Sequence, residues 1–350
     1  MASVDSLLSL LSTYSNPPKN YVGTFLFISY IVSALELTSL LTGQLFMIYE
    51  KWTSKQPQSL HPSPQHILLF ASLAVLSFSL LSYNMLAVLF TSYINWCDRT
   101  GVKAGFAFSE ISSDLMPKLW AWTTGSTLFE DFARDLVADG REGWFWTGSA
   151  LAFTLGICET FGRIGTERNV PHLWAYFLLG QILPISFTQN LFYITLLLLP
   201  RPSPELKSYT TTSLPTIITP ILTLLSTPLL ILLPSTLSTP WFLPLALLLR
   251  ILMLVPLLPQ LIGLHRYSVK SKPSRNTFST PMLVVLGVFA VHAGWKIARG
   301  EWSLQGLWES RGETPAARAV VWDAGVGVVS AGLWWVVGVV KEAGEERKRR

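Results

Sequence analysis

The sequence predicts an all-α integral membrane protein, a single domain of about eight transmembrane helices formed by residues 1–350. Only 13% of the residues are charged, compared with about 25% in average soluble domains. The mean hydropathy is +0.42. Several apolar runs also reach about 18 residues, the length at which a helix can cross the hydrocarbon core of a bilayer.

Prolines and charged clusters separate the apolar runs and set the limits of each expected helix. In chain order, the expected spans are 21–49, 66–94, 143–163, 172–199, 214–234, 241–263, 281–298 and 318–340. The fifth and sixth spans contain recurring prolines, so we expect kinked helices there. Neighbouring helices can satisfy the carbonyls that such prolines leave free.

The fourth span, 172–199, is long enough to cross a membrane but carries polar residues within it. Gln181, Gln189 and Asn190 lie inside the run, and Pro184 interrupts it. Because an unpaired amide is costly in hydrocarbon, these side chains are expected to face other helices or a polar cavity. Two interpretations stay open: the helix forms the wall of a site, or the amides only join helices.

Residues 97–142 form the longest polar segment, which is acidic and is expected to lie at the membrane surface. Phe129, Phe132 and Leu136 are spaced as on one face of an amphipathic helix, which Gly140 would end. Asp131 and Asp135 lie on the polar face of that helix. For 105–122 the sequence leaves two alternatives, an interfacial segment and one that dips into the membrane.

Eight spans would place both termini on one side of the membrane. Seventeen of the 26 Lys and Arg would then lie on that side and eight on the other. The positive-inside rule predicts that both termini are cytosolic, including the basic tail 341–350. We expect the endoplasmic reticulum as the location. The tail also accounts for much of the net charge of +5, so we expect anionic lipid, and not nucleic acid, as its partner.

Ionisable residues within the spans are the best candidates for function. Glu36, Glu159 and Asp323 fall inside expected helices, where a charge costs at least about 2.5 kcal/mol on insertion scales. A carboxylic acid kept protonated by burial can act as a general acid. Arg250 has three open interpretations: a buried partner for a carboxylate, a side chain that extends to the interface, or a wrong span boundary.

The eight-span arrangement would place four ionisable residues at similar depth: Glu159, His172, His292 and Asp323. They could share one pocket, with aromatic side chains around it that favour a cationic intermediate. These aromatic residues are Trp174, Tyr176, Trp295 and Trp322. The alternative is that the acids bond neighbouring helices and that the His and Trp residues anchor helix ends at the interface.

The sequence contains no motif of a P-loop, a zinc protease, an EF-hand or an Asp-rich magnesium site. The two cysteines, Cys97 and Cys158, belong to no metal-binding spacing. The absence of an Asp-rich motif argues against a magnesium-dependent enzyme that ionises prenyl diphosphates.

Three stretches resemble the membrane-bound fungal terpene cyclases of the ascofuranone and ascochlorin pathways and their relatives in indole-diterpene clusters. They are LWAWTTGSTLFEDFARDLVADG (119–140) followed by WFWT (144–147), HLWAYFLLGQILPISFTQNLF (172–192) and VVWDAG (320–325). The resemblance implies a metal-independent enzyme that protonates a terminal epoxide on a prenyl chain and steers the resulting cation into a ring. It also implies that no metal and no redox cofactor is used, and that the substrate is hydrophobic, an epoxidised prenylated aromatic or polyketide.

On this hypothesis Asp323 or Glu159 donates the proton, and His172 holds the acid or guides capture of the cation. The expected substrate-binding residues are Trp174, Tyr176, Gln189, Asn190, Trp322 and Glu36. Two alternatives remain. In a transporter of a hydrophobic metabolite, the buried carboxylates would couple transport to protons. In a scaffold for pathway enzymes, the acidic segment 97–142 would be the docking surface.

Overall fold

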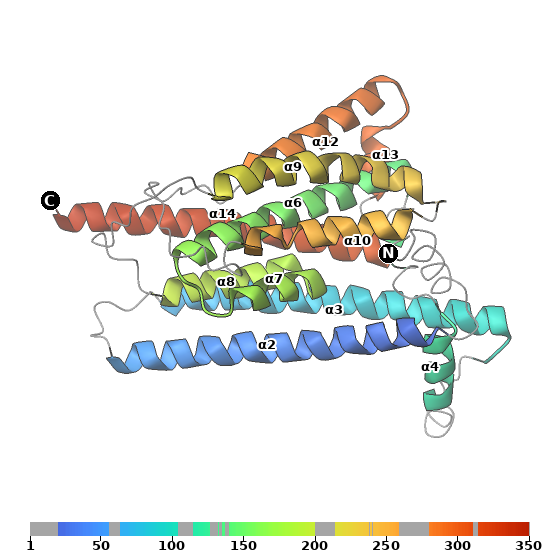
Figure 1. Ribbon diagram of the computed structural model, residues 1–350, viewed down its shortest axis with the longest axis horizontal. Helices are drawn as coiled ribbons and strands as arrows, with labels where there is room; N and C mark the ends of the chain where they lie inside the picture. The colour runs from blue at the N-terminus through green and yellow to red at the C-terminus, as the bar shows by residue number, and fades with distance from the viewer. Residues whose placement is uncertain are drawn as a thin grey trace, which may run out of the picture.

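The computed structural model describes residues 20–55, 64–103, 115–126, 132, 135–136, 140–199, 214–237, 239, 241–258, 280–310 and 314–349. All regular secondary structure in these ranges is helical, which confirms the predicted all-α class. The helices lie mostly side by side along one direction, as Figure 1 shows.

Within the described residues, three helices are long and apolar enough to cross a membrane, so the predicted count of eight spans is not confirmed. The three helices are α2 (Tyr21–Lys55), α3 (Pro64–Thr100) and α14 (Pro315–Arg349). Each has at least 35 residues and therefore measures about 50 Å. The outer faces of α2 and α3 carry exposed large side chains such as Phe25 and Tyr83, a surface suited to lipid.

The other lengthwise helices are shorter: α6 (Gly140–Glu167), α9 (Leu214–Leu232), α10 (Phe242–Leu252) and α12 (Thr280–Ala298). Prolines end two of them early, as expected. The 3₁₀ turn η2 (Leu233–Thr236) follows α9, and η3 (Val255–Leu257) follows α10. A short helix, α13 (Leu304–Ser310), connects α12 to α14 at one end of the bundle.

Helix α4 (Leu115–Thr124) lies across the end of the bundle where α2 begins and α3 ends (Figure 1). Trp122 packs against Tyr93 and Trp96 of α3, and the backbone N–H of Asn20 donates to the Thr124 carbonyl at 2.7 Å. Both alternatives for 105–122, an interfacial segment and one that dips into the membrane, stay predictions. Residues 105–114 lie outside the described ranges, as do Phe129 and Asp131.

Residues 173–198 form two helices, α7 (Leu173–Ile182) and α8 (Ile185–Leu198), and not one. Leu183 adopts an extended conformation, with φ −104° and ψ 176°, as expected for a residue before proline. Pro184 has no N–H to continue the helical bonds. The Tyr176 and Thr195 hydroxyls are hydrogen-bonded at 2.6 Å, so the chain turns back on itself at Leu183–Pro184.

Contacts with α2 and α3 confirm that α7 and α8 form a hairpin. Helix α7 runs antiparallel to α2: Gln44 Nε2 donates to the Pro171 carbonyl, and the Tyr30 hydroxyl donates to the Ile182 carbonyl. In the same way α8 runs antiparallel to α3, because Ser186 bonds Ser77 and Tyr193 contacts Phe70. These two bounding helices themselves run in opposite directions (Figure 1).

The prediction that 172–199 crosses the bundle once is therefore wrong. Both arms of the α7–α8 hairpin lie in the same half of the bundle, and its tip reaches the middle. The prediction that both termini lie on the same side of the membrane depended on this single crossing. In the structure, the start of α2 and the end of α14 lie at opposite ends of the bundle (Figure 1).

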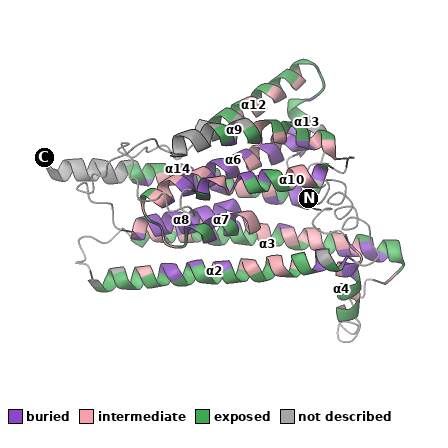
Figure 2. Ribbon diagram, in the orientation of Figure 1, coloured by how far each residue is buried: buried purple, intermediate pink, exposed green. Residues whose placement is uncertain are grey.

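The hairpin lies at the centre of the core. Thirteen of the 14 residues of α8 are buried, and α3, α14, α2 and α7 pack around it. Figure 2 shows burial concentrated on α6, α7 and α8, whereas the outer faces of α2 and α3 are exposed. The buried aromatic residues include Phe161, Tyr176, Phe192 and Tyr193, which contact one another or Trp334.

Candidate functional site

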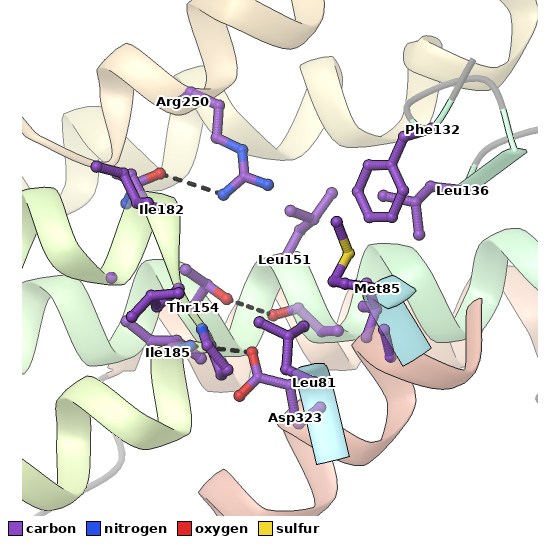
Figure 3. Close-up of a pocket in the computed structure, with 18 of the residues that line it drawn as sticks. Leu81, Met85, Phe132, Leu136, Leu151, Thr154, Ile182, Ile185, Arg250 and Asp323 are labelled. Carbon is purple, nitrogen blue, oxygen red and sulfur yellow. Dashed lines mark hydrogen bonds between the residues drawn. The ribbon is translucent and has the colours of Figure 1, made fainter. Parts of the chain in front are cut away.

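A cavity lies at the tip of the hairpin, where α7 ends and α8 begins. It contains about 690 Å³ of space between protein atoms, counting its open mouth. The walls come from α2, α3, α6, α10 and α14, and from Phe132 and Leu136, which precede α6 (Figure 3).

Asp323 of α14 reaches the first turn of α8 and binds its free backbone donors. The Ile185 N–H donates to Oδ2 at 3.0 Å, and the Ser186 N–H donates to Oδ1 at 2.9 Å. The N-terminus of a helix carries partial positive charge and unsatisfied N–H groups. The break at Pro184 therefore creates the binding position that the Asp323 carboxylate occupies.

The C-terminus of α7 lies beside this position and offers free carbonyls of the opposite polarity. The Tyr30 hydroxyl donates to the Ile182 carbonyl, across from α2. Gln181 Oε1 accepts a hydrogen bond from Arg250 Nη1 at 3.3 Å, and Gln181 Nε2 lies 3.7 Å from Cys158 Sγ. The tip thus brings an acidic and a basic side chain to one cavity.

The remaining wall is mostly apolar. Leu81 and Met85 of α3, Leu151 of α6 and the Phe132 ring face the cavity in Figure 3. The Thr154 hydroxyl is present in the wall and lies in the helix that carries Leu151. A cavity with apolar walls and a few polar groups can hold a hydrophobic ligand and orient one reactive end.

The structure places one of the three predicted catalytic residues at this cavity. Asp323 lines it, whereas Glu159 and His172 are not among its lining residues. Glu159 is half-buried on α6. His172 is exposed before α7, with a left-handed φ of 51°, and its ring contacts Trp174.

None of the six predicted substrate-binding residues lines the cavity. Trp174, Trp322 and Glu36 are exposed, and Tyr176 is fully buried within the hairpin, where it bonds Thr195. The predicted pocket shared by Glu159, His172, His292 and Asp323 does not form. His292 instead contacts Trp295 and Trp302 near the end of α12.

Gln189 and Asn190 are fully buried and hydrogen-bonded within the bundle. Gln189 Nε2 donates to the Tyr193 hydroxyl at 2.9 Å and to the Gly327 carbonyl of α14 at 3.2 Å. Asn190 Nδ2 donates to the Ser186 carbonyl at 2.7 Å. The Gln189 contact joins α8 to α14, as in the interpretation in which the amides join helices, whereas the Asn190 contact stays within α8.

Sequence reasoning missed Tyr30, Thr154 and Phe132 as lining residues. An isolated tyrosine or threonine in an apolar span gives no signal that separates it from ordinary packing. Arg250 was visible as the exceptional cation of its segment, and Pro184 as an interruption. The sequence alone does not show that these two features lie at one site. Only the hairpin, which brings Gln181 to Arg250, places them together.

In the described residues, no group of three or more His, Cys, Asp or Glu side chains is arranged to hold a metal ion. Comparisons with known proteins give no family for this chain: no family model, no curated protein and no solved structure matches it. The function must therefore be argued from the geometry of the cavity.

Proposed function

We propose that the protein is an integral membrane terpene cyclase that protonates the epoxide of a prenyl chain and closes it into a ring. The observation that carries this proposal is the position of Asp323. Its carboxyl group faces a cavity with both apolar and polar walls, while two backbone N–H groups at the start of α8 bind its oxygens. The resemblance of 119–147, 172–192 and 320–325 to fungal membrane cyclases supports the same reaction.

The chemistry requires an acid that can lose a proton to an epoxide oxygen. The carboxylate left on Asp323 would be stabilised by the Ile185 and Ser186 N–H groups and by the partial positive charge of α8. The epoxide C–O bond then breaks, and the electron pair of an alkene attacks the carbon. Loss of one proton from the final cation balances the proton donated, so substrate and product have equal mass.

The apolar wall would exclude water from the cation, which otherwise adds to it. Tyr30 and Phe132 are aromatic residues of this wall, and an aromatic face attracts a cation. They take the role that the sequence suggested for Trp174 and Trp322. Leu81 and Leu151 would hold the prenyl tail folded.

We further propose that the basic end of the bundle is cytosolic, in the endoplasmic reticulum membrane. With the hairpin in place, the connections 50–65, 163–171, 200–213 and 265–275 and the tail 341–350 hold fifteen Lys and Arg. Ten lie toward the other end, and Arg250 is the remaining one. The positive-inside rule then places the tail in the cytosol and the start of α2 on the opposite side.

A microsomal assay tests the proposed reaction. Microsomes from a host that lacks related pathways receive a panel of aromatic compounds that carry an epoxidised farnesyl chain. The expected product is an isomer of equal mass and different retention. Asp323→Asn should reduce its formation at least about 100-fold, because an amide cannot donate the proton.

Glu50→Gln is the matched control, since Glu50 is an exposed carboxylate on α2 far along the helix from Tyr30. It should leave the isomer unchanged. Asp323→Asn keeps an acceptor oxygen for the start of α8, so its thermal unfolding in detergent should remain cooperative. An isomer formed equally by wild type and a folded Asp323→Asn protein would contradict the assignment of the acid.

A transporter is the second candidate, and the hairpin favours it. Half-helices that meet in mid-bundle recur in transporters, where their ends bind the transported group. Wild-type vesicles would then accumulate an unmodified hydrophobic compound, and no isomer would form from any epoxide. The scaffold alternative rests on 97–142, of which Asp135 is exposed and Asp131 lies outside the described residues.

A further inference from the structure

Arg250 lies near the end of α10 and presents a guanidinium group to the cavity (Figure 3). A guanidinium has five N–H donors. Arg250 makes one hydrogen bond, from Nη1 to Gln181 Oε1, and its 3.3 Å length marks it as weak. Within the described part of the chain, Arg250 has no ion pair.

Asp323 interacts electrostatically with this charge. The two side chains line the same cavity, yet no ion pair joins them. Both oxygens of Asp323 already accept hydrogen bonds from the start of α8. Arg250 is exposed and lines the cavity, so its remaining N–H donors are open to an anionic ligand.

We propose that Arg250 binds an ionised oxygen group of the substrate, a carboxylate or phenolate, and makes the cavity selective for acidic amphiphiles. The inference rests on the proposed function, since it names the head group of the molecule whose prenyl tail reaches Asp323. A guanidinium matches a planar oxyanion because two parallel N–H groups bind it together. The apolar wall suits the rest of such a ligand.

The charge balance of the cavity supports a ligand bound with its anionic head group at Arg250 and its prenyl tail at Asp323. Proton donation requires Asp323 in its neutral form, which leaves Arg250 as an uncompensated cation. An anionic head group at Arg250 restores neutrality while Asp323 holds its proton. The head would lie between α10 and the end of α7, and the chain would extend past Leu151 toward Asp323.

Binding of a matched pair of probes tests the inference without requiring turnover. The probes are tritiated 3-farnesylbenzoate and its methyl ester, added at pH 7.5 to the full chain in phosphatidylcholine nanodiscs. Wild type should bind the acid about 10- to 100-fold more tightly than the ester, as expected for hydrogen bonds to a charged group. Arg250→Gln should bind both probes about equally, and Arg250→Lys should retain part of the preference.

Arg99→Gln is the control, because Arg99 lies at the far end of α3 and bonds the carbonyl of Asn95 in its own helix. It should keep the full preference for the acid. Equal binding of the two probes by wild type would overturn the inference, and so would a preference that survives in Arg250→Gln. If Arg250→Gln does not fold, the wild-type comparison and Arg250→Lys still decide.

A phospholipid head group offers the same oxyanion chemistry as an acidic substrate. The measurement is therefore repeated in nanodiscs that contain phosphatidylserine. If this lipid removes the preference for the acid, the assignment to the substrate is overturned in favour of a lipid. If the preference persists, the substrate assignment is supported.

The outcome is separable from that of the proposed function. Asp323→Asn should lose cyclisation but keep the preference for the acid. Cyclisation by a protein without that preference would overturn the inference alone. A preference in a protein that forms no isomer would overturn the cyclase proposal alone.

Discussion

The two halves of the bundle along its length differ in how they are filled. In one half, the α7–α8 hairpin occupies the space between α2, α3, α6 and α14 with buried aromatic rings. In the other half the hairpin is absent, and the cavity begins at its tip. The comparison shows that the turn at Leu183–Pro184 creates both the packed core and the site. The hairpin fills one half of the bundle up to this turn, and the turn leaves the first N–H groups of α8 free to bind Asp323.

Polar residues also behave differently in the two halves. Around the hairpin, Gln189, Asn190 and Tyr176 are fully buried. Gln189 and Tyr176 bond other helices, and Asn190 bonds within α8. At the tip, Asp323 and Arg250 face a cavity. A polar residue in an apolar helix therefore indicates a site only where the backbone beside it is broken and open.

The largest expected effect concerns membrane topology, because a hairpin places the two ends of 172–199 on the same side of the membrane and a single crossing places them on opposite sides. Glu167→Cys lies before the hairpin, and Ser203→Cys lies beyond its last helix, which ends at Leu198. In a hairpin both cysteines react with a membrane-impermeant maleimide from the same side of sealed vesicles. A single crossing would place them on opposite sides, so labelling of one only after the vesicles are opened would contradict the hairpin.

The next largest effect should come from the filled half. Phe192→Ala removes a ring with no exposure, which lies 4.6 Å from the Phe161 ring and 5.5 Å from the Tyr176 ring, centroid to centroid. The loss of contacts and the remaining void should reduce the free energy of unfolding by about 3–5 kcal/mol. Thermal unfolding in detergent measures the change.

Met85→Ala is the comparison from the cavity half, since the Met85 side chain is half-buried and lines the cavity. Its removal enlarges a space that already exists and creates no new void, so we expect a loss of only about 1 kcal/mol. Equal losses for Met85→Ala and Phe192→Ala would mean that the two halves are packed alike.

A smaller effect should come from the contact between the hairpin and α14. A Cβ added at Gly327 would lie 2.4 Å from Phe153 Cε1 and 3.2 Å from Gln189 Oε1. Gly327→Ala should therefore cost about 1–3 kcal/mol through overpacking. Gly325→Ala on the same helix has nothing within 4 Å and should leave the unfolding temperature unchanged or raise it slightly.

The sequence was sufficient for the helical class and for seven of the eight expected segments as single helices or helix–turn units. It was insufficient for 172–199, because a mostly apolar stretch of 28 residues satisfies the length of a crossing and a proline is tolerated in one. Only contacts between distant residues, such as Tyr176 with Thr195, distinguish a hairpin from a kinked span.

The site was predictable only in part, because the sequence identifies costly residues but not which of them meet. Asp323 was identified by its cost in an apolar helix, a property of the residue alone. Trp174 and Trp322 were wrongly oriented toward a pocket, because the sequence gives the depth of a side chain along a helix but not the direction in which it points. Tyr30 became a lining residue only because the hairpin tip ends beside it.

The smallest expected effect concerns the hydroxyl pair that joins α3 to α8 near the tip. Ser77 and Ser186 are both buried and hydrogen-bonded to each other. Hydrogen bonds between helices in membrane proteins contribute about 0.6 kcal/mol on average, since the separated helices find other partners in the bilayer. Ser77→Ala should therefore lower the unfolding temperature slightly, and Ser79→Ala, at an exposed position on the same helix, should not change it.

Because Ser186 also donates its backbone N–H to Asp323, the Ser77→Ala protein tests whether the tip is held by the hydroxyl pair or by the carboxylate. Unaltered cyclisation with a slightly lower unfolding temperature would assign the tip to Asp323, whereas a loss of cyclisation comparable to that of Asp323→Asn would assign it to the serine pair.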